Sequence, residues 1–199
     1  MSGTPLSPGF VDPVREAQGC FRALLEATAR PGTIVRLAFP APPPPLPAAM
    51  AALALTLIDA DTPVWLDPAA ASGSALAWLR FHCGCRIVAR LEEAAFALVA
   101  GPAAMEALGQ LPAGTDEYPD RGATAVIAIA GFDAGEPLHL SGPGIAGEVT
   151  LRVSGLPAGF VAARAANHAL FPRGIDHVLV AGDRAVSLPR STIVAAGRE

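Results

Sequence analysis

The first element that the hydrophobic pattern predicts is an amphipathic helix near the beginning of the chain. From residue 14 to residue 29, apolar side chains recur every three or four positions, with charged side chains largely on the opposite face. Asp12 can cap this helix and Pro13 suits its first position. The dipeptide Pro31-Gly32 stops it. We therefore expect a helix that runs from Pro13 up to this dipeptide.

After this helix, strand-like and helix-like patterns alternate along the chain. Residues 123–130 are rich in Ala, Val and Ile, which predicts a central strand buried on both faces. The apolar stretch 46–58 predicts a buried helix, whereas 94–100 fits a strand or a helix equally well. The other predicted strands are 33–39, 64–66, 87–88, 137–141, 148–153, 177–181, 184–188 and 191–195, and the other predicted helices are 72–82, 103–111 and 157–170.

This alternation predicts one α/β domain over residues 1–199, with a mixed β-sheet flanked by helices. Neither a repeat nor an interdomain linker interrupts the pattern, and the pattern leaves the strand order open. Residues 1–9 are expected to be flexible. Residues 40–47 hold four consecutive prolines and are expected to form a polyproline II connector, with a docking site for an SH3-like partner as the alternative.

Composition narrows the classes of function. The 199 residues include no Lys, which excludes Schiff-base chemistry and the phosphate-binding loop of P-loop enzymes. The net charge is −4 without a concentrated basic stripe, so no nucleic-acid partner is expected. The longest apolar stretch is too short to span a membrane, and the first residues do not resemble a signal peptide. Three cysteines form no disulfide framework, so we expect a cytoplasmic protein.

The segment His82-Cys83-Gly84-Cys85 is the most conspicuous local group of reactive side chains. Thiolate and imidazole are good zinc ligands, but a structural site needs four ligands and only Cys20 remains as a further thiol. A Cys–His nucleophile is a second interpretation, and ordinary packing is a third. Packing is the interpretation that we adopt, so neither a metal ligand nor a catalytic residue is predicted.

Two further segments could bind an anion. Gly142 and Gly144 flank a proline between two predicted strands, where main-chain N–H groups could approach a phosphate, although a turn that needs positive φ explains them as well. Arg173 and Asp176 could work as a pair, or Arg173 could bind a phosphate or phosphonate oxygen, although a solvated loop is the interpretation that we prefer. Arg190 poses the same choice. The acidic loop 114–122 could face a cation or an Arg of a partner, or be simply solvated.

Eight short motifs are spread along the chain. They are Phe21-Arg22-x-Leu24-Leu25, Asp61-Thr62-Pro63-Val64-Trp65-Leu66, Leu79-Arg80-Phe81-His82, Gly114-Thr115-Asp116-Glu117-Tyr118-Pro119, Gly122-Ala123-Thr124, Leu140-Ser141-Gly142-Pro143-Gly144-Ile145, Phe171-Pro172-Arg173-Gly174-Ile175-Asp176 and Pro189-Arg190-Ser191-Thr192. In this order and spacing, from about residue 10 to residue 195, the chain resembles the PhnH family, the H subunit of bacterial carbon–phosphorus lyase.

The resemblance implies a role in phosphonate catabolism. The family takes part in forming α-D-ribose 1-methylphosphonate 5-triphosphate from a purine nucleoside triphosphate and methylphosphonate. It implies a homodimer that joins G, I and J subunits, with ATPase-like K and L subunits as further partners. It also implies a fold like the large domain of pyridoxal-phosphate-dependent transferases without the cofactor site, and hence no cofactor. The absence of Lys agrees with that independently.

Three functional hypotheses follow for the chain. The first is an architectural subunit, which would show an exposed apolar surface. The second is a subunit that contributes Gly142, Gly144, Arg173, Asp176 and Arg190 to a shared site for a nucleotide or phosphonate. The third is a free-standing enzyme that uses His82 and a cysteine, or the acidic loop. The first is the interpretation that we carry forward.

Overall fold

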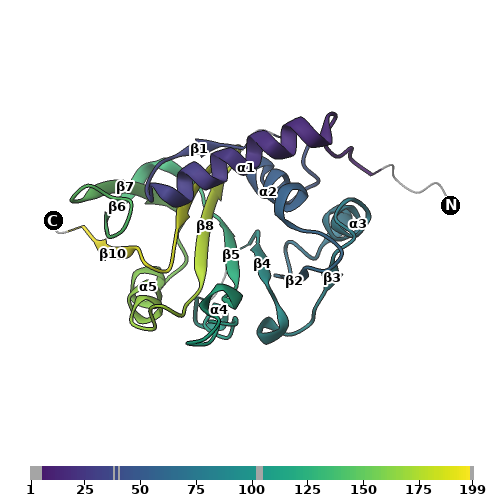
Figure 1. The fold of residues 1–199 in the computed structure, drawn as a ribbon. Coiled ribbons are helices and arrows are strands. Elements are labelled where there is room, and N and C mark those ends of the chain that lie inside the picture. The colour runs from purple at the N-terminus through teal and green to yellow at the C-terminus, as the bar shows by residue number, and fades with distance from the viewer. Residues whose placement is uncertain (1–5, 38, 40, 102–104, 198–199) are drawn as a thin grey trace.

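The computed structural model describes residues 6–37, 39, 41–101 and 105–197. Two sheets organise these residues (Figure 1). The larger is a seven-stranded mixed sheet in the order β1-β9-β8-β5-β4-β2-β3, and the smaller is an antiparallel sheet in the order β10-β6-β7. The strands are β1 (Val35–Arg36), β2 (Pro63–Leu66), β3 (Arg86–Ile87), β4 (Phe96–Val99), β5 (Thr124–Ala128), β6 (Gly131–Ser141), β7 (Val149–Ser154), β8 (Asp176–Ala181), β9 (Arg184–Leu188) and β10 (Ile193–Ala196).

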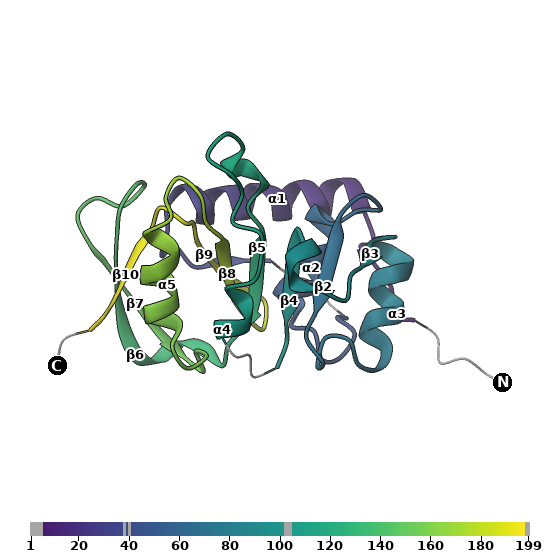
Figure 2. The same ribbon diagram turned by 90° about the horizontal axis from the view of Figure 1, so that it is seen from below.

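Helices cover both faces of the large sheet, as expected for an α/β domain with a mixed sheet. The helices α1, α2 and α3 share one hydrophobic core with one sheet face, whereas α4, α5 and the small sheet share a second core with the other. The small sheet and α3 lie at opposite ends of the molecule in both views (Figures 1 and 2). The helices are α1 (Pro13–Ala29), α2 (Ala48–Leu57), α3 (Gly73–His82), α4 (Met105–Leu108) and α5 (Phe160–His168), with short 3₁₀ turns at Leu91–Glu93 and Pro119–Arg121.

The first helix begins and ends where the sequence predicts. Asp12 Oδ1 accepts a hydrogen bond from Arg15 N at 3.1 Å, and Pro13 occupies the first helical position. Cys20 and Leu24 face the core, and Glu26 forms an ion pair with Arg30, the residue that caps the C-terminal end of the helix. The confirmed cap shows that local residue chemistry is sufficient to set the limits of this helix.

The predicted buried helix 46–58 is confirmed as α2. Its residues from Ala49 to Ala54 are fully buried. Four of these six residues are alanines, and their small side chains let α2 lie close to α1 and to β8. Described residues 41–47 connect β1 to α2 and include a turn in which Leu46 N donates to Pro43 O at 2.9 Å, so this stretch is not one unbroken polyproline II segment.

The predicted strands agree with the structure in position, but some differ in length. The strand predicted at 123–130 is confirmed as β5, the central strand of the seven. The ambiguous stretch 94–100 contains β4. The strand predicted at 33–39 shortens to two residues, because β1 is an edge strand that pairs only with β9. The strand predicted at 137–141 begins already at Gly131, because β6 has two partners in the small sheet.

Two other predicted elements change in length. The helix predicted at 157–170 is limited to Phe160–His168, because Gly159 lies in the left-handed region at φ 76°. Of the helix predicted at 103–111, residues 103 and 104 lie outside the described residues. Of the stretch 1–9, residues 1–5 lie outside them as well, and the carbonyl groups of Ser7 and Pro8 accept hydrogen bonds from α3.

Within the described ranges, each helix is too short or too polar to cross a membrane.

Candidate functional site

The motif residues Asp176 and Arg190 form one ion pair at the end of the large sheet. Asp176 begins β8 and Arg190 follows β9, and these two strands are antiparallel neighbours. The Arg190 guanidinium donates from Nη2 to Asp176 Oδ2 at 2.6 Å and from Nε to Oδ1 at 3.2 Å, while the Arg190 main-chain N donates to the same Oδ1 at 2.7 Å. The carboxylate thus accepts a bidentate fork and a main-chain bond.

A second contact ties Arg190 to the acidic loop. Arg190 Nη1 donates to the carbonyl oxygen of Pro119. Gly122 lies so close to Arg190 and to the Gly174 carbonyl that a Cβ would collide with both. Gly174 N in turn donates to Ala113 O at 2.8 Å. These contacts hold four motif segments together and leave the Arg190 side chain only 13% exposed. The charge of Arg190 is thus neutralised within the chain.

The pairing of Arg173 differs from the sequence-based expectation. Arg173 Nε lies 3.0 Å from Asp116 Oδ1, so its described ion-pair partner is Asp116 rather than Asp176. The Arg173 side chain is 41% exposed and that of Asp116 is 84% exposed. A pair this exposed contributes little to stability, because solvent screens it. Arg173 is therefore more accessible to a ligand or a partner than Arg190.

Gly142 and Gly144 lie in the turn between β6 and β7. Both have positive φ, 124° and 84°. A Cβ at Gly144 would collide with the Ala29 carbonyl oxygen at the end of α1, and a Cβ at Gly142 would lie 2.9 Å from Ser191 O. Glycine is thus required both by conformation and by close approach. The Ala29 carbonyl lies at the negative end of the α1 dipole, which repels an anion. These contacts therefore favour the interpretation of Gly142 and Gly144 as a tight turn over that of an anion-binding site.

One functional feature was not predicted from the sequence, namely the buried cation of Arg164 on α5. The side chain is 1% exposed. Its Nη2 donates to Pro189 O at 2.6 Å and to Thr192 O at 2.8 Å, and its Nη1 donates to His177 Nδ1 at 3.0 Å. Arg164 therefore connects α5, β8 and the loop that carries Arg190.

Burial lowers the pKa values of both Arg164 and His177. Burial lowers the pKa of Arg164 to about 10, opposed by the nearby Asp176 charge. Burial lowers the pKa of His177 to about 3, and the adjacent Arg164 charge contributes. His177 is consequently neutral, and its Nδ1 accepts a hydrogen bond from the Arg164 guanidinium. The sequence does hold one indication that Arg164 is buried. On a helix, Arg164 lies at i+4 from Phe160 and shares its face with Asn167 at i+7.

The cysteine segment is arranged for packing. Cys83 and Cys85 are buried, and burial raises the pKa of Cys83 to about 12 and that of Cys85 above its ordinary value. His82 Nε2 donates to the Ser7 carbonyl at 3.1 Å rather than to a thiol. Neither thiol is therefore a thiolate at neutral pH, as a nucleophile would have to be. In the part of the chain that the structure describes, no three His, Cys, Asp or Glu side chains gather in a metal-binding geometry.

Comparisons with known proteins point to one family. The family model described as "Bacterial phosphonate metabolism protein (PhnH)" matches residues 8–195. The chain is 46% identical over 187 residues, 94% of each chain, to the "Alpha-D-ribose 1-methylphosphonate 5-triphosphate synthase subunit PhnH" of Rhizobium meliloti (strain 1021). It is 38% identical over 175 residues to the "Putative C-P lyase subunit protein HtxG" of Stutzerimonas stutzeri, covering 88% of this chain and 84% of that protein.

Proposed function

Because the chain belongs to the family of bacterial phosphonate metabolism proteins named PhnH, we propose that it is an architectural subunit of the synthase that forms α-D-ribose 1-methylphosphonate 5-triphosphate. In this role it takes part in phosphonate catabolism as part of a carbon–phosphorus lyase assembly. The pairing of Arg190 with Asp176 carries the proposal, because one of the two arginines considered for anion binding is neutralised within the fold. The buried thiols add support, since they leave no nucleophile in the cysteine segment.

An exposed apolar surface supports an assembly role. Helix α1 buries one face and exposes Val14, Phe21 and Leu25 at i, i+7 and i+11, so these three side chains form a stripe along its outer side. Val14 is 80% exposed, and the large apolar residues Val11 and Phe81 are exposed as well. Large apolar side chains exposed along one side of a helix are suited to a protein–protein contact. We assign the α1 stripe, defined as Val14, Phe21 and Leu25, to subunit docking.

The partners proposed for these surfaces are a second copy of the chain and the G, I and J subunits, with K and L as further members. We propose the cytoplasm as the compartment in which this assembly works. The expected likeness to the large domain of pyridoxal-phosphate-dependent transferases stays a prediction. Reconstitution tests the proposal: the other synthase subunits should form product only when this chain is present, and this chain alone should form none. Product formation by this chain alone would overturn it.

Charging the α1 stripe should weaken assembly without unfolding the chain. In the variant Phe21→Glu, a half-exposed aromatic contact becomes a carboxylate that must be desolvated on docking. We expect the affinity for the other subunits to fall at least about tenfold, or roughly 1.4 kcal/mol. Titration of labelled chain with the other subunits measures this. The matched control is Gly19→Glu, at an exposed position of α1 outside the stripe where nothing lies within 4 Å of an added Cβ, and it should have a much smaller effect. Equal affinities for the parent and Phe21→Glu would contradict the assignment.

The accessible guanidinium of Arg173 favours a second candidate function, in which the chain contributes ligand-binding residues to a shared site. In that case Arg173 would bind a phosphate or phosphonate oxygen, with Gly142, Gly144, Asp176 and Arg190 shaping the surrounding loops. Under the architectural proposal Arg173 contacts neither substrate, so Arg173→Ala should change the synthase KM for either substrate by less than about twofold. Loss of its exposed ion pair should also cost little stability. A rise in KM of tenfold or more in an intact assembly would favour the shared site instead.

A further inference from the structure

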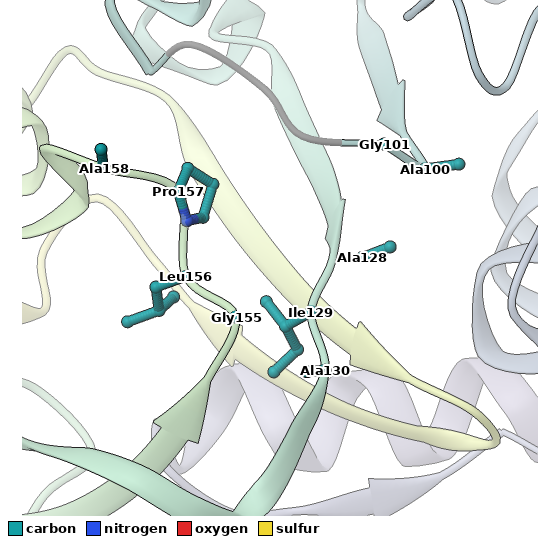
Figure 3. A pocket seen from close by; sticks show the side chains of 9 residues that line it. All are labelled: Ala100, Gly101, Ala128, Ile129, Ala130, Gly155, Leu156, Pro157 and Ala158. Atoms are coloured by element: carbon teal, nitrogen blue, oxygen red, sulfur yellow. The ribbon is translucent and has the colours of Figure 1, made fainter.

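An open pocket lies at the carboxyl ends of β4 and β5, and the nine side chains that line it carry no polar atom (Figure 3). Four main-chain N–H groups in its wall already donate to acceptors within the chain, namely those of Ala100, Gly101, Ile129 and Ala130. Because these donors are paired, they select no ligand. Unpaired polar atoms that indicate a bound molecule lie elsewhere, in the interior beside α5.

Two such atoms are the Nε atom of Arg164 and the Oγ1 atom of Thr192. Each is buried and lacks a hydrogen-bond partner among the residues that the structure describes. The residues themselves are 1% and 0% exposed, so bulk solvent does not reach them. A buried donor or hydroxyl without a partner costs free energy, and buried polar groups of folded proteins are nearly always paired with protein or with ordered water. These two atoms therefore require a partner.

The shape of the guanidinium directs Arg164 Nε toward the loop that contains Thr192. Arg164 Nη2 donates to Pro189 O at 2.6 Å and to Thr192 O at 2.8 Å. In a planar guanidinium, the Nε–H bond points to the same side as one N–H bond of Nη2. The loop is compact, because Thr192 N donates to Pro189 O at 2.9 Å. The unpaired N–H of Arg164 and the unpaired hydroxyl of Thr192 thus belong to one buried contact.

The turn between β6 and β7 packs against the same loop. A Cβ added at Gly142 would lie 2.9 Å from Ser191 O and 3.6 Å from the Cα atom of Thr192. In a site this enclosed, a valine would fill nearly the same volume as Thr192 without a hydroxyl group to desolvate. The hydroxyl is therefore accounted for by a polar partner rather than by packing.

We propose that one internal water molecule bridges Arg164 Nε and Thr192 Oγ1. Its oxygen accepts from the Nε–H group and shares a second hydrogen bond with the hydroxyl, which can donate or accept. Two polar partners lie within the range found for buried waters. A neutral molecule suffices, because the nearby Asp176 charge already raises the pKa of Arg164 against the effect of burial. The water makes Thr192 a positioning residue for the loop of Arg190, and this inference does not depend on the assembly role.

A high-resolution crystal structure of the whole chain tests the proposal directly. We expect one ordered water oxygen within about 3.2 Å of both Arg164 Nε and Thr192 Oγ1. The proposal is overturned if no water lies there, if the water contacts only one of the two atoms, or if the Thr192 hydroxyl bonds to a protein group instead.

Three variants complete the test. Thr192→Val removes the hydroxyl and should raise the equilibrium constant for unfolding in urea at least about tenfold, because the water loses one of its two partners. The matched control is Thr150→Val, at an exposed position of β7, which should change that constant by less than about twofold. Thr192→Ser keeps the hydroxyl and should retain the water in its crystal structure. A Thr192→Val variant as stable as the parent, or a Thr192→Ser variant without the water, would contradict the proposal.

Discussion

Replacing Arg164 by Ala should lower the free energy of unfolding by about 3–5 kcal/mol, one of the two largest effects that the structure predicts. The variant removes the donor of three hydrogen bonds, two of them buried and one partly buried. The carbonyl groups of Pro189 and Thr192 and the Nδ1 atom of His177 would all lose their partner. Because these acceptors are enclosed, water replaces the lost guanidinium poorly, and a cavity remains.

Urea unfolding measures this effect, with the slope of the transition checked for two-state behaviour. Arg80→Ala is the matched control, since Arg80 is an exposed arginine in helix α3 and its loss should change stability by less than about 0.5 kcal/mol. An Arg164→Ala variant that unfolds at the same urea concentration as the parent would show that this network does not hold α5 to the loop of Arg190.

The second large effect is a loss of stability in mild acid through His177. An unfolded His titrates near pH 6.5, whereas burial and the Arg164 charge hold the pKa of folded His177 at about 3. Between these values the unfolded chain binds more protons than the folded chain. The free energy of unfolding should therefore be fully retained above pH 6.5 and fall below it, by roughly 1.4 kcal/mol for each pH unit, until pH 3 is approached.

The comparison with His177→Gln isolates this contribution. The Gln side chain does not titrate, and its carbonyl oxygen can accept the hydrogen bond of Arg164. Stability curves of the parent and the variant between pH 7 and pH 4.5 should diverge as the pH falls, with the parent the steeper of the two. Parallel curves would mean that His177 takes up its proton in the folded state as easily as in the unfolded chain.

Local chemistry in the sequence was sufficient to predict some elements. Asp12 and Pro13 set the beginning of α1 through a side-chain cap and a fixed φ, which involve only neighbouring residues. The apolar residues of β5 indicate burial on both faces, which only a central strand allows. In both cases the information lies within about a dozen consecutive residues.

Non-local pairing explains what the sequence could not predict. The small sheet pairs β6 with β10, two strands separated by β7, α5, β8 and β9. The residues of neither strand indicate which other strand it pairs with. The same holds for Arg173, because its partner Asp116 lies 57 positions earlier in the chain, whereas Asp176 is only three positions away. Sequence proximity alone makes Asp176 one candidate partner, whereas the structure pairs Arg173 with Asp116. Arg164 could be suspected from its helical face, but its acceptors come from a distant loop.

The central claim is that this chain works as a subunit, since its candidate polar residues pair with one another. The most direct test is to measure molecular mass by light scattering on two samples. One is the chain purified alone, and the other is the chain co-expressed with the other subunits of the carbon–phosphorus lyase assembly. The account predicts a dimer alone and a larger, stable complex that contains this chain when the G, I and J proteins are present. A chain that stays outside a complex which those proteins form among themselves would contradict the account.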